Sequence, residues 1–186
     1  MKEIRHISTS FNGSRIVLAE FKSQVQILDI STLSVISEFQ TILDFGGRRM
    51  AISENGRICI CGCWEKHGII AYNADTGEKI WQRKDLKKLQ HLHILPLDTN
   101  SVFAQFEIGA SRILNIQTGM DIKKLNGVKL YWEGPYDSVN VHEKASRIEL
   151  LDRRNQKVIA KIQRETFATL ALAFSPGSLY PRWPPI

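Results

Sequence analysis

The sequence predicts an all-β fold built from about four repeats of roughly 40 residues. First, a turn-forming Asp or Asn recurs at Asp29, Asn73, Asn115 and Asp152, at offsets of 44, 42 and 37 residues. Second, an apolar strand precedes each of these residues, and a strand containing an Ile follows each of them. Each segment is therefore predicted to be a β-hairpin with a polar corner.

Each recurring position of this repeated hairpin has a physical reason. The corner Asp or Asn can accept hydrogen bonds from backbone N–H groups two or three residues ahead, and a polar side chain three residues on adds a second local bond. Gly77 and Gly119 follow where a positive φ is accessible. We expect the Ile of the returning strand to pack on the sheet, because β-branched side chains fit a pleated surface. These residues are Ile36, Ile80, Ile122 and Ile159.

A second hairpin signal precedes each corner. The segments SFNGSRIVLAEF (10–21) and SENGRICICGC (53–63) place Asn-Gly before or between apolar runs. The third unit has a looser version in LDTNSVFAQF (97–106), and in the fourth the signal is reduced to GPYDSVNV (134–141). Each unit thus has four short strands. Length and strand count together predict a small propeller-like array of about four four-stranded blades.

One segment carries a resemblance to known propellers. AYNADTGEKIW (71–81) is similar to the repeat consensus of quinoprotein-type β-propellers, and the strand–turn pattern resembles WD-repeat propellers. The resemblance implies that Trp81 wedges between neighbouring blades. Ser37, Lys123 and Ala160 occupy the equivalent places, and no unit has a clear Trp-Asp dipeptide or Gly-His pair. The resemblance covers most of residues 4–180 as a repeat pattern, and it implies a fold and not a function.

The C-terminal part of the chain predicts an extra strand after the fourth unit. Residues 167–180, FATLALAFSPGSLY, resemble the opening of a further unit, whereas the prolines of 181–186 cannot donate ladder hydrogen bonds. We expect one domain over 1–180 and a Pro-rich tail over 181–186. Three arrangements remain open: a closed ring, an open arc whose strand edges are covered by a second copy or another protein, and a chain shortened from a longer parent.

The composition is that of a globular protein, with 43% hydrophobic and 24% charged residues. No apolar run reaches the roughly 18–20 residues of a membrane helix, and the N-terminus has no apolar block of signal-peptide length. Three cysteines gathered in CICGC fit a reducing compartment. We therefore expect a cytoplasmic protein with no membrane partner.

Residues for catalysis or metal binding are not gathered by any motif. The sequence has no phosphate-binding loop, nucleophile elbow or His-Glu-x-x-His motif, and no acidic cluster for the calcium-like ion of quinoprotein dehydrogenases. Cys59, Cys61, Cys63 and His67 could supply zinc ligands, but alternate residues of one strand point in parallel and converge poorly. We expect buried thiols at a blade contact, no cofactor, no metal and no enzyme activity.

The predicted function is a non-enzymatic scaffold that presents propeller loops to a protein partner. One alternative is a small cytoplasmic immunity protein that neutralises a toxin. A second is a basic nucleic-acid-associated protein, suggested by the net charge of +6. A homodimer formed through open strand edges is a further way to engage a partner.

The predicted partner-binding residues lie where connections inside blades share a face with connections between blades. Aromatic residues in loops are common anchors of interfaces, and lysines supply an electrostatic rim. Tyr131 and Trp132 belong either to a loop or to an inner strand of the fourth blade. The full set is Lys66, His67, Lys84, Lys87, Lys88, Glu107, Tyr131, Trp132 and Tyr136.

Overall fold

The computed structural model describes residues 4–10, 12–20, 24–42, 49–62, 67–95, 98–133, 139–152 and 154–163. These ranges hold sixteen β-strands and no helix. None of the described residues therefore belongs to a helix long and apolar enough to cross a membrane. The predicted extra strand over 167–180 and the tail over 181–186 lie outside the described residues.

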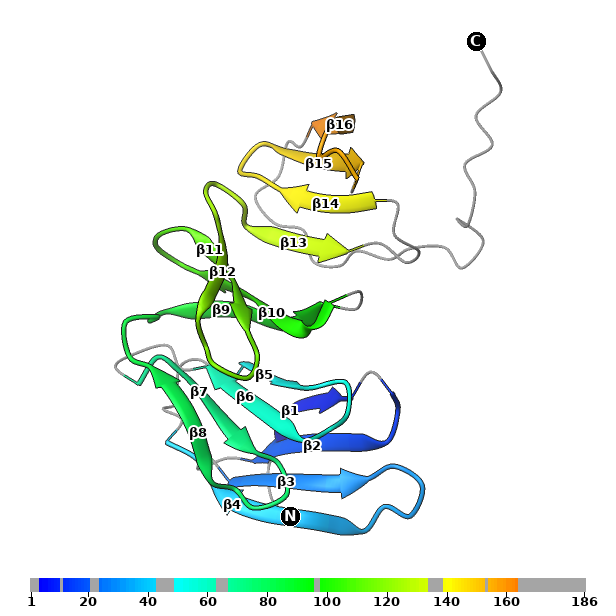
Figure 1. The fold of residues 1–186 in the computed structure, drawn as a ribbon, viewed down its shortest axis with the longest axis vertical. Helices are drawn as coiled ribbons and strands as arrows, with labels where there is room; N and C mark the ends of the chain where they lie inside the picture. The colour runs from blue at the N-terminus through cyan, green and yellow to red at the C-terminus, as the bar shows by residue number, and fades with distance from the viewer. Residues whose placement is uncertain are drawn as a thin grey trace. The chain divides into compact units, whose positions relative to one another are not determined.

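The strands form four antiparallel sheets of four strands, and within each sheet the strands follow chain order (Figure 1). The all-β array of four-stranded blades predicted from the repeats is thereby confirmed. The first sheet contains β1 (Ile4–Thr9), β2 (Arg15–Glu20), β3 (Gln24–Asp29) and β4 (Val35–Gln40), and the second contains β5 (Arg49–Ile52), β6 (Ile58–Gly62), β7 (Ile69–Asn73) and β8 (Lys79–Arg83). The third contains β9 (Leu89–Leu95), β10 (Asp98–Phe106), β11 (Ser111–Asn115) and β12 (Asp121–Leu125), and the fourth contains β13 (Leu130–Glu133), β14 (Val139–Glu143), β15 (Arg147–Asp152) and β16 (Val158–Gln163).

The chain divides into two compact units, residues 1–126 and 127–186. The first unit holds three of the sheets and the second unit holds the fourth. The predicted single domain over 1–180 spans both units and stays a prediction.

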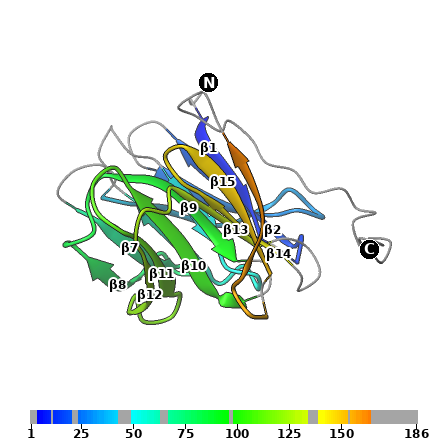
Figure 2. The same cartoon turned by 90° about the horizontal axis from the view of Figure 1, so that it is seen from above.

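Two apolar layers hold the first unit together. One lies between the first and second sheets and includes Val17, Ile27, Met50 and Tyr72. The other lies between the second and third sheets, whose strands run alongside one another in both views (Figure 1 and Figure 2), and it includes Ile60. Because successive residues of a strand point to opposite faces, the second sheet is buried on both sides, and every residue of β6 is buried.

The cysteines of β6 belong to the first of these layers. Cys59 and Cys61 are fully buried among the apolar side chains that separate the first two sheets. This confirms the prediction of buried thiols at a blade contact for these two residues. Cys63 lies outside the described residues.

The four hairpin corners have the predicted hydrogen bonds. Asp29 Oδ1 accepts from the N–H groups of Ser31 (2.8 Å) and Thr32 (3.0 Å). The same two bonds, at N···O distances between 2.8 and 3.3 Å, are present at Asn73, Asn115 and Asp152. Donation by the Ser31 hydroxyl and by these N–H groups lowers the pKa of the Asp29 carboxyl. Each corner is thus fixed by one short polar side chain.

The repeated spacing of the returning Ile has a different meaning from the one predicted. Ile36 is the extra residue between the pairs Ile27–Ser37 and Leu28–Val35, so it forms a β-bulge and has no cross-strand partner. The equivalent residues Ile80, Ile122 and Ile159 are extra in the same way. All four are at least 37% exposed. The expectation that they pack on the sheet was therefore wrong.

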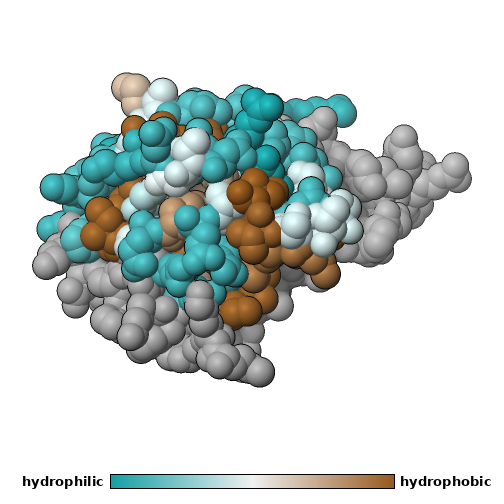
Figure 3. Space-filling view, turned by 90° about the horizontal axis from the view of Figure 1, so that it is seen from below, coloured by the Kyte–Doolittle hydropathy of each residue, from teal (hydrophilic) through white to brown (hydrophobic). Residues whose placement is uncertain are grey.

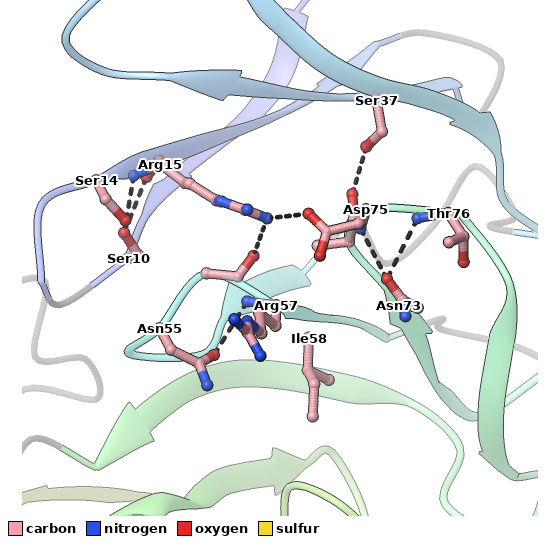
Figure 4. A network of polar contacts seen from close by, with 12 residues as sticks. Ser10, Ser14, Arg15, Ser37, Asn55, Arg57, Ile58, Asn73, Asp75 and Thr76 are labelled. Atoms are coloured by element: carbon pink, nitrogen blue, oxygen red, sulfur yellow. Dashed lines mark hydrogen bonds and ion pairs between the residues drawn. The ribbon is translucent and has the colours of Figure 1, made fainter.

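Polar contacts link the Asn73 and Asn115 corners to the outer strand of the preceding sheet. Ser37 Oγ on β4 donates to the carbonyl oxygen of Ala74, directly after the corner Asn73 (Figure 4). At the equivalent place of the next sheet, Trp81 Nε1 donates to the carbonyl oxygen of Ile116 at 2.9 Å. Trp81 therefore bridges neighbouring sheets, as the propeller resemblance implies.

A second link between the first two sheets comes from Arg15 (Figure 4). Its Nη1 atom lies 2.6 Å from Asp75 Oδ1 and donates to the carbonyl oxygen of Gly56 at 2.9 Å. Arg15 thus joins the β1–β2 hairpin to both hairpins of the second sheet.

The fourth sheet contains a buried carboxylate held by two cations. The Glu149 side chain is 5% exposed and lies 2.7 Å from Lys144 Nζ and 2.6 Å from Arg147 Nε. Hydrogen bonds from Lys144 and then Arg147 lower the pKa of Glu149 from 4.5 to about 2. The folded state therefore prefers the ionised carboxylate.

We expect this carboxylate to make the fourth sheet acid-sensitive. Its contribution is complete above pH 4.5 and is lost as the pH falls towards 2, because only the unfolded chain gains the proton in that window. Glu149→Gln should lower the free energy of unfolding by about 1–3 kcal/mol at pH 6 and by progressively less below pH 4.5. Urea titrations at several pH values measure this, with the exposed Glu78→Gln as control. A constant difference across the pH range would contradict it.

Candidate functional site

Three connections of the first unit meet in one surface, which we call the loop platform and define as residues 67–68, 83–88 and 107–110. Gln82 Nε2 donates to the carbonyl oxygen of His67 at 3.0 Å, so the turn before β7 lies against the end of β8. The Glu107 N–H donates to the carbonyl oxygen of Lys88 at 2.9 Å, and their side chains form an ion pair of 3.1 Å. The connections between β6 and β7, β8 and β9, and β10 and β11 are thus joined.

The 83–88 connection turns its charged residues outwards because one apolar residue anchors it. Leu86 is buried among the side chains between the second and third sheets. Its N–H donates to the carbonyl oxygen of Arg83 at 3.3 Å, which closes a tight turn. Lys84, Lys87 and Lys88 are consequently exposed.

Arg83 fixes the base of the platform. Its Nε and Nη2 atoms donate to the two carboxylate oxygens of Asp85 at 2.9 and 2.7 Å. Its Nη1 atom donates to the carbonyl oxygen of Gly119 at 2.7 Å and to Asp121 at 3.0 Å. These bonds raise the pKa of Arg83, chiefly through Asp85, and they lower the pKa of Asp85. Bidentate pairs of this kind are geometrically specific.

The remaining charge on the platform is positive. Asp85 is neutralised by Arg83, and Glu107 is paired with Lys88. Within the part of the chain that the structure describes, Lys84 and Lys87 have no ion-pair partner. These two ammonium groups are available to an acidic surface.

An exposed apolar residue lies on the 107–110 connection of the platform. Ile108 follows Glu107 in the turn between β10 and β11 and is 71% exposed, the highest exposure among the large hydrophobic residues described. Sequence reasoning placed the turn on this face but did not single out Ile108. An Ile between Glu107 and Gly109, with no strand pattern to bury it, is the signal that could have found it.

The structure thus brings together five of the predicted partner-binding residues, namely His67, Lys84, Lys87, Lys88 and Glu107. Tyr131 and Trp132 belong to the inner strand β13, where they pair with His142 and Val141, so the strand alternative for them holds. They lie in the second unit. Lys66 and Tyr136 lie outside the described residues.

The residues weighed as zinc ligands can be placed in part. Cys59 and Cys61 point to the same side of β6, and their sulfur atoms are 3.8 Å apart, closer than the spacing of alternate strand positions because the side chains converge. Among the residues that the structure describes, no group of three or more His, Cys, Asp or Glu side chains could hold a metal ion.

Comparison with known proteins supports the fold. No protein-family model and no curated protein matches the sequence. Among solved structures, the chain resembles the β-propeller domain of Myceliophteria thermophila Cps50 (Swd1), with a TM-score of 0.68, 11% identity, and coverage of 90% of this chain and 57% of that chain. It also resembles BamB from Moraxella catarrhalis, with a TM-score of 0.62, 15% identity, and coverage of 84% and 48%.

An enzyme is also among the similar structures. The match to Kuenenia stuttgartiensis hydrazine synthase has a TM-score of 0.62, 14% identity, and coverage of 86% of this chain and 48% of that chain. The chain therefore spans about half the length of the solved structures it resembles. Identities of 11–15% establish a propeller-type repeat fold alone.

Proposed function

We propose that this protein is a non-enzymatic scaffold that binds a protein partner through the loop platform. The observation that carries the proposal is the exposed Ile108 on a turn bonded through Glu107 to Lys88, together with the exposed Lys84 and Lys87 of the same 83–88 connection. An apolar centre with a polar or charged rim is the usual arrangement of a protein interface. Rigid presentation also reduces the ordering cost of binding.

The partner that fits this surface offers an apolar pocket surrounded by carboxylates. Ile108 would fill the pocket, while Lys84 and Lys87 would contact the acidic rim and accelerate association. An acidic or membrane-active toxin neutralised in the cytoplasm is one partner of this chemistry. The exposed Ile108 favours a protein partner over a nucleic acid, because recognition of a phosphate backbone relies on cations and not on an aliphatic anchor.

Reversing the platform charge is expected to abolish partner capture. We expect Lys84→Glu combined with Lys87→Glu to reduce capture of a stoichiometric protein from a native lysate by about tenfold or more, because like charges then face the acidic rim. Ile108→Asp should have a similar effect by removing the anchor. Affinity capture followed by quantitative mass spectrometry measures both effects.

The matched control keeps the charge change and moves it elsewhere. Arg57→Glu combined with Lys79→Glu alters two exposed cations at the opposite end of the second sheet, beside the Asn73 corner, and capture should remain near wild type. Equal losses in both double variants, or no enriched protein at all, would contradict the proposal. Capture of RNA or DNA with an affinity that falls steeply with salt would support the nucleic-acid alternative instead.

A further inference from the structure

One face of the first sheet carries a group of apolar side chains next to a polar pair, Gln26 and Glu38. Side chains alternate across each strand, so while Val17 and Ile27 face the second sheet, their neighbours face the opposite way. We call these neighbours the first-sheet face and define it as Ile7, Ile16, Leu18 and Leu28. Ile7 is 59% exposed and the others are half-buried. Figure 3 views the molecule from below the orientation of Figure 1 and shows apolar residues gathered between hydrophilic ones.

The same positions in the next two sheets are covered. Counted back from the corner residue, Leu28 is equivalent to Tyr72 and Leu114, which are 4% and 0% exposed. Tyr72 is covered by the first sheet, and Leu114 belongs to the layer between the second and third sheets. In this repeat, the first-sheet face is therefore equivalent to the face on which a preceding sheet packs.

The fourth sheet carries the matching kind of face. Val141, Ile148, Leu150 and Ile162, which we call the fourth-sheet face, occupy the register positions of Val17, Val25, Ile27 and Phe39 in the first sheet. Those first-sheet residues are the ones that pack on the second sheet. Ile162 is 52% exposed and Ile148 and Leu150 are half-buried. This face has the residues needed to cover another sheet.

The corner of the first sheet and the outer strand of the fourth sheet have side chains of complementary size. At the covered corners a Cβ on Gly77 would lie 2.5 Å from Phe39, and a Cβ on Gly119 would lie 2.7 Å from Trp81. The first sheet has Leu33 at this corner position, also with positive φ, and it is 69% exposed. A side chain there requires a smaller residue on the strand that covers it.

The outer strand of the fourth sheet meets this requirement. β16 has Ala160 at the register position of Trp81 and Ile162 at that of Phe39. In this contact the larger residue is at the corner (Leu33) and the smaller one is on the strand (Ala160). Leu33 can therefore pack over Ala160 and against Ile162. The exchange of sizes preserves the volume of the contact.

We propose that two copies of this chain associate, with the fourth-sheet face of each copy packing on the first-sheet face of the other. The proposed pair has two equivalent contacts, related by a twofold axis. A second copy is the occupant that fits, because Ala160 and Ile162 on its β16 strand match the size of the exposed Leu33 at the first-sheet corner. This proposal is independent of the loop platform.

The test is the mass of the chain in solution. Size-exclusion chromatography with light scattering at several concentrations should give twice 21.2 kDa for the wild type. Leu33→Glu and Ile162→Lys should each weaken association by about tenfold or more and shift the mass towards 21.2 kDa. Both residues are exposed, and circular dichroism checks that the variants fold.

Mixing the two variants gives the decisive measurement. In a mixed pair, one contact places the carboxylate introduced by Leu33→Glu against the ammonium group introduced by Ile162→Lys, and the other contact is wild type. The mixture should therefore regain the mass that neither variant shows alone. Met120→Lys, at an exposed apolar residue outside both faces and outside the loop platform, should leave the mass unchanged. A wild-type mass of 21.2 kDa at every concentration would overturn the proposal. A dimer whose mass is unchanged by both Leu33→Glu and Ile162→Lys would overturn it as well.

Discussion

Gly68→Ala is expected to destabilise the protein by about 3 kcal/mol and to loosen the loop platform. Gly68 has a φ of +70°, and a Cβ there would lie 2.0 Å from the Arg83 carbonyl oxygen and 3.0 Å from the Lys84 Cα. The obstructing atoms belong to the backbone at the end of β8, where Ile69 pairs with Arg83. They cannot move without breaking that pair, whereas a flexible side chain could rotate away.

Gly13→Ala is the matched control for this effect. Gly13 has nearly the same φ, +69°, but nothing lies within 4 Å of a Cβ placed there. Gly13→Ala should therefore lower the free energy of unfolding by only about 1 kcal/mol, because an L-residue is placed in a left-handed backbone conformation. Urea denaturation of the two variants separates strain of the backbone from collision with β8. Equal losses would show that the collision is relieved, and the account of Gly68 would be wrong.

Trp81→Ala is expected to cost about 3 kcal/mol, since it removes a large side chain from the layer between the second and third sheets. The indole lies over Gly119 and donates to the carbonyl oxygen of Ile116 at 2.9 Å. Trp81→Phe keeps much of the packing and loses the hydrogen bond, so it should cost about 1–2 kcal/mol. Thermal and urea unfolding measure both substitutions.

The neighbouring residue provides the control for Trp81. Ile80 is 44% exposed as the bulge residue of the same strand, and Ile80→Ala should change stability by no more than about 0.5 kcal/mol. If Trp81→Ala were as mild as Ile80→Ala, the wedge between the two sheets would carry little of the stability. A larger loss of stability in Ile80→Ala than in Trp81→Ala would mean that the exposed Ile80 on β8 is covered in solution.

The repeats were predictable because their corners are local. Asp29 and Asn73 bond to N–H groups two and three residues away, so the sequence alone contains both partners of each bond. The role of Trp81 was also accessible, through its resemblance to a propeller repeat. These features need no knowledge of which sheets pack together.

Features that depend on register were not predictable in the same way. An Ile that recurs at the same position of each returning strand favours packing on the sheet, because it is apolar and β-branched. Ile80 nevertheless lies at a bulge and is exposed. Whether a position is an extra residue depends on where the partner strand is paired, which propensity does not specify. Ile108 was missed for a related reason, because a turn residue has no periodicity to interpret.

The bulges on the four outer strands have a consequence for how the protein behaves at high concentration. Each bulge interrupts the even spacing of backbone groups along β4, β8, β12 and β16. A foreign strand laid against such an edge could match only a few consecutive N–H and C=O groups. Charged residues on these strands, such as Lys79 and Arg83 on β8 and Lys123 and Lys124 on β12, act in the same direction, so we expect edge-to-edge fibrillar growth to be disfavoured.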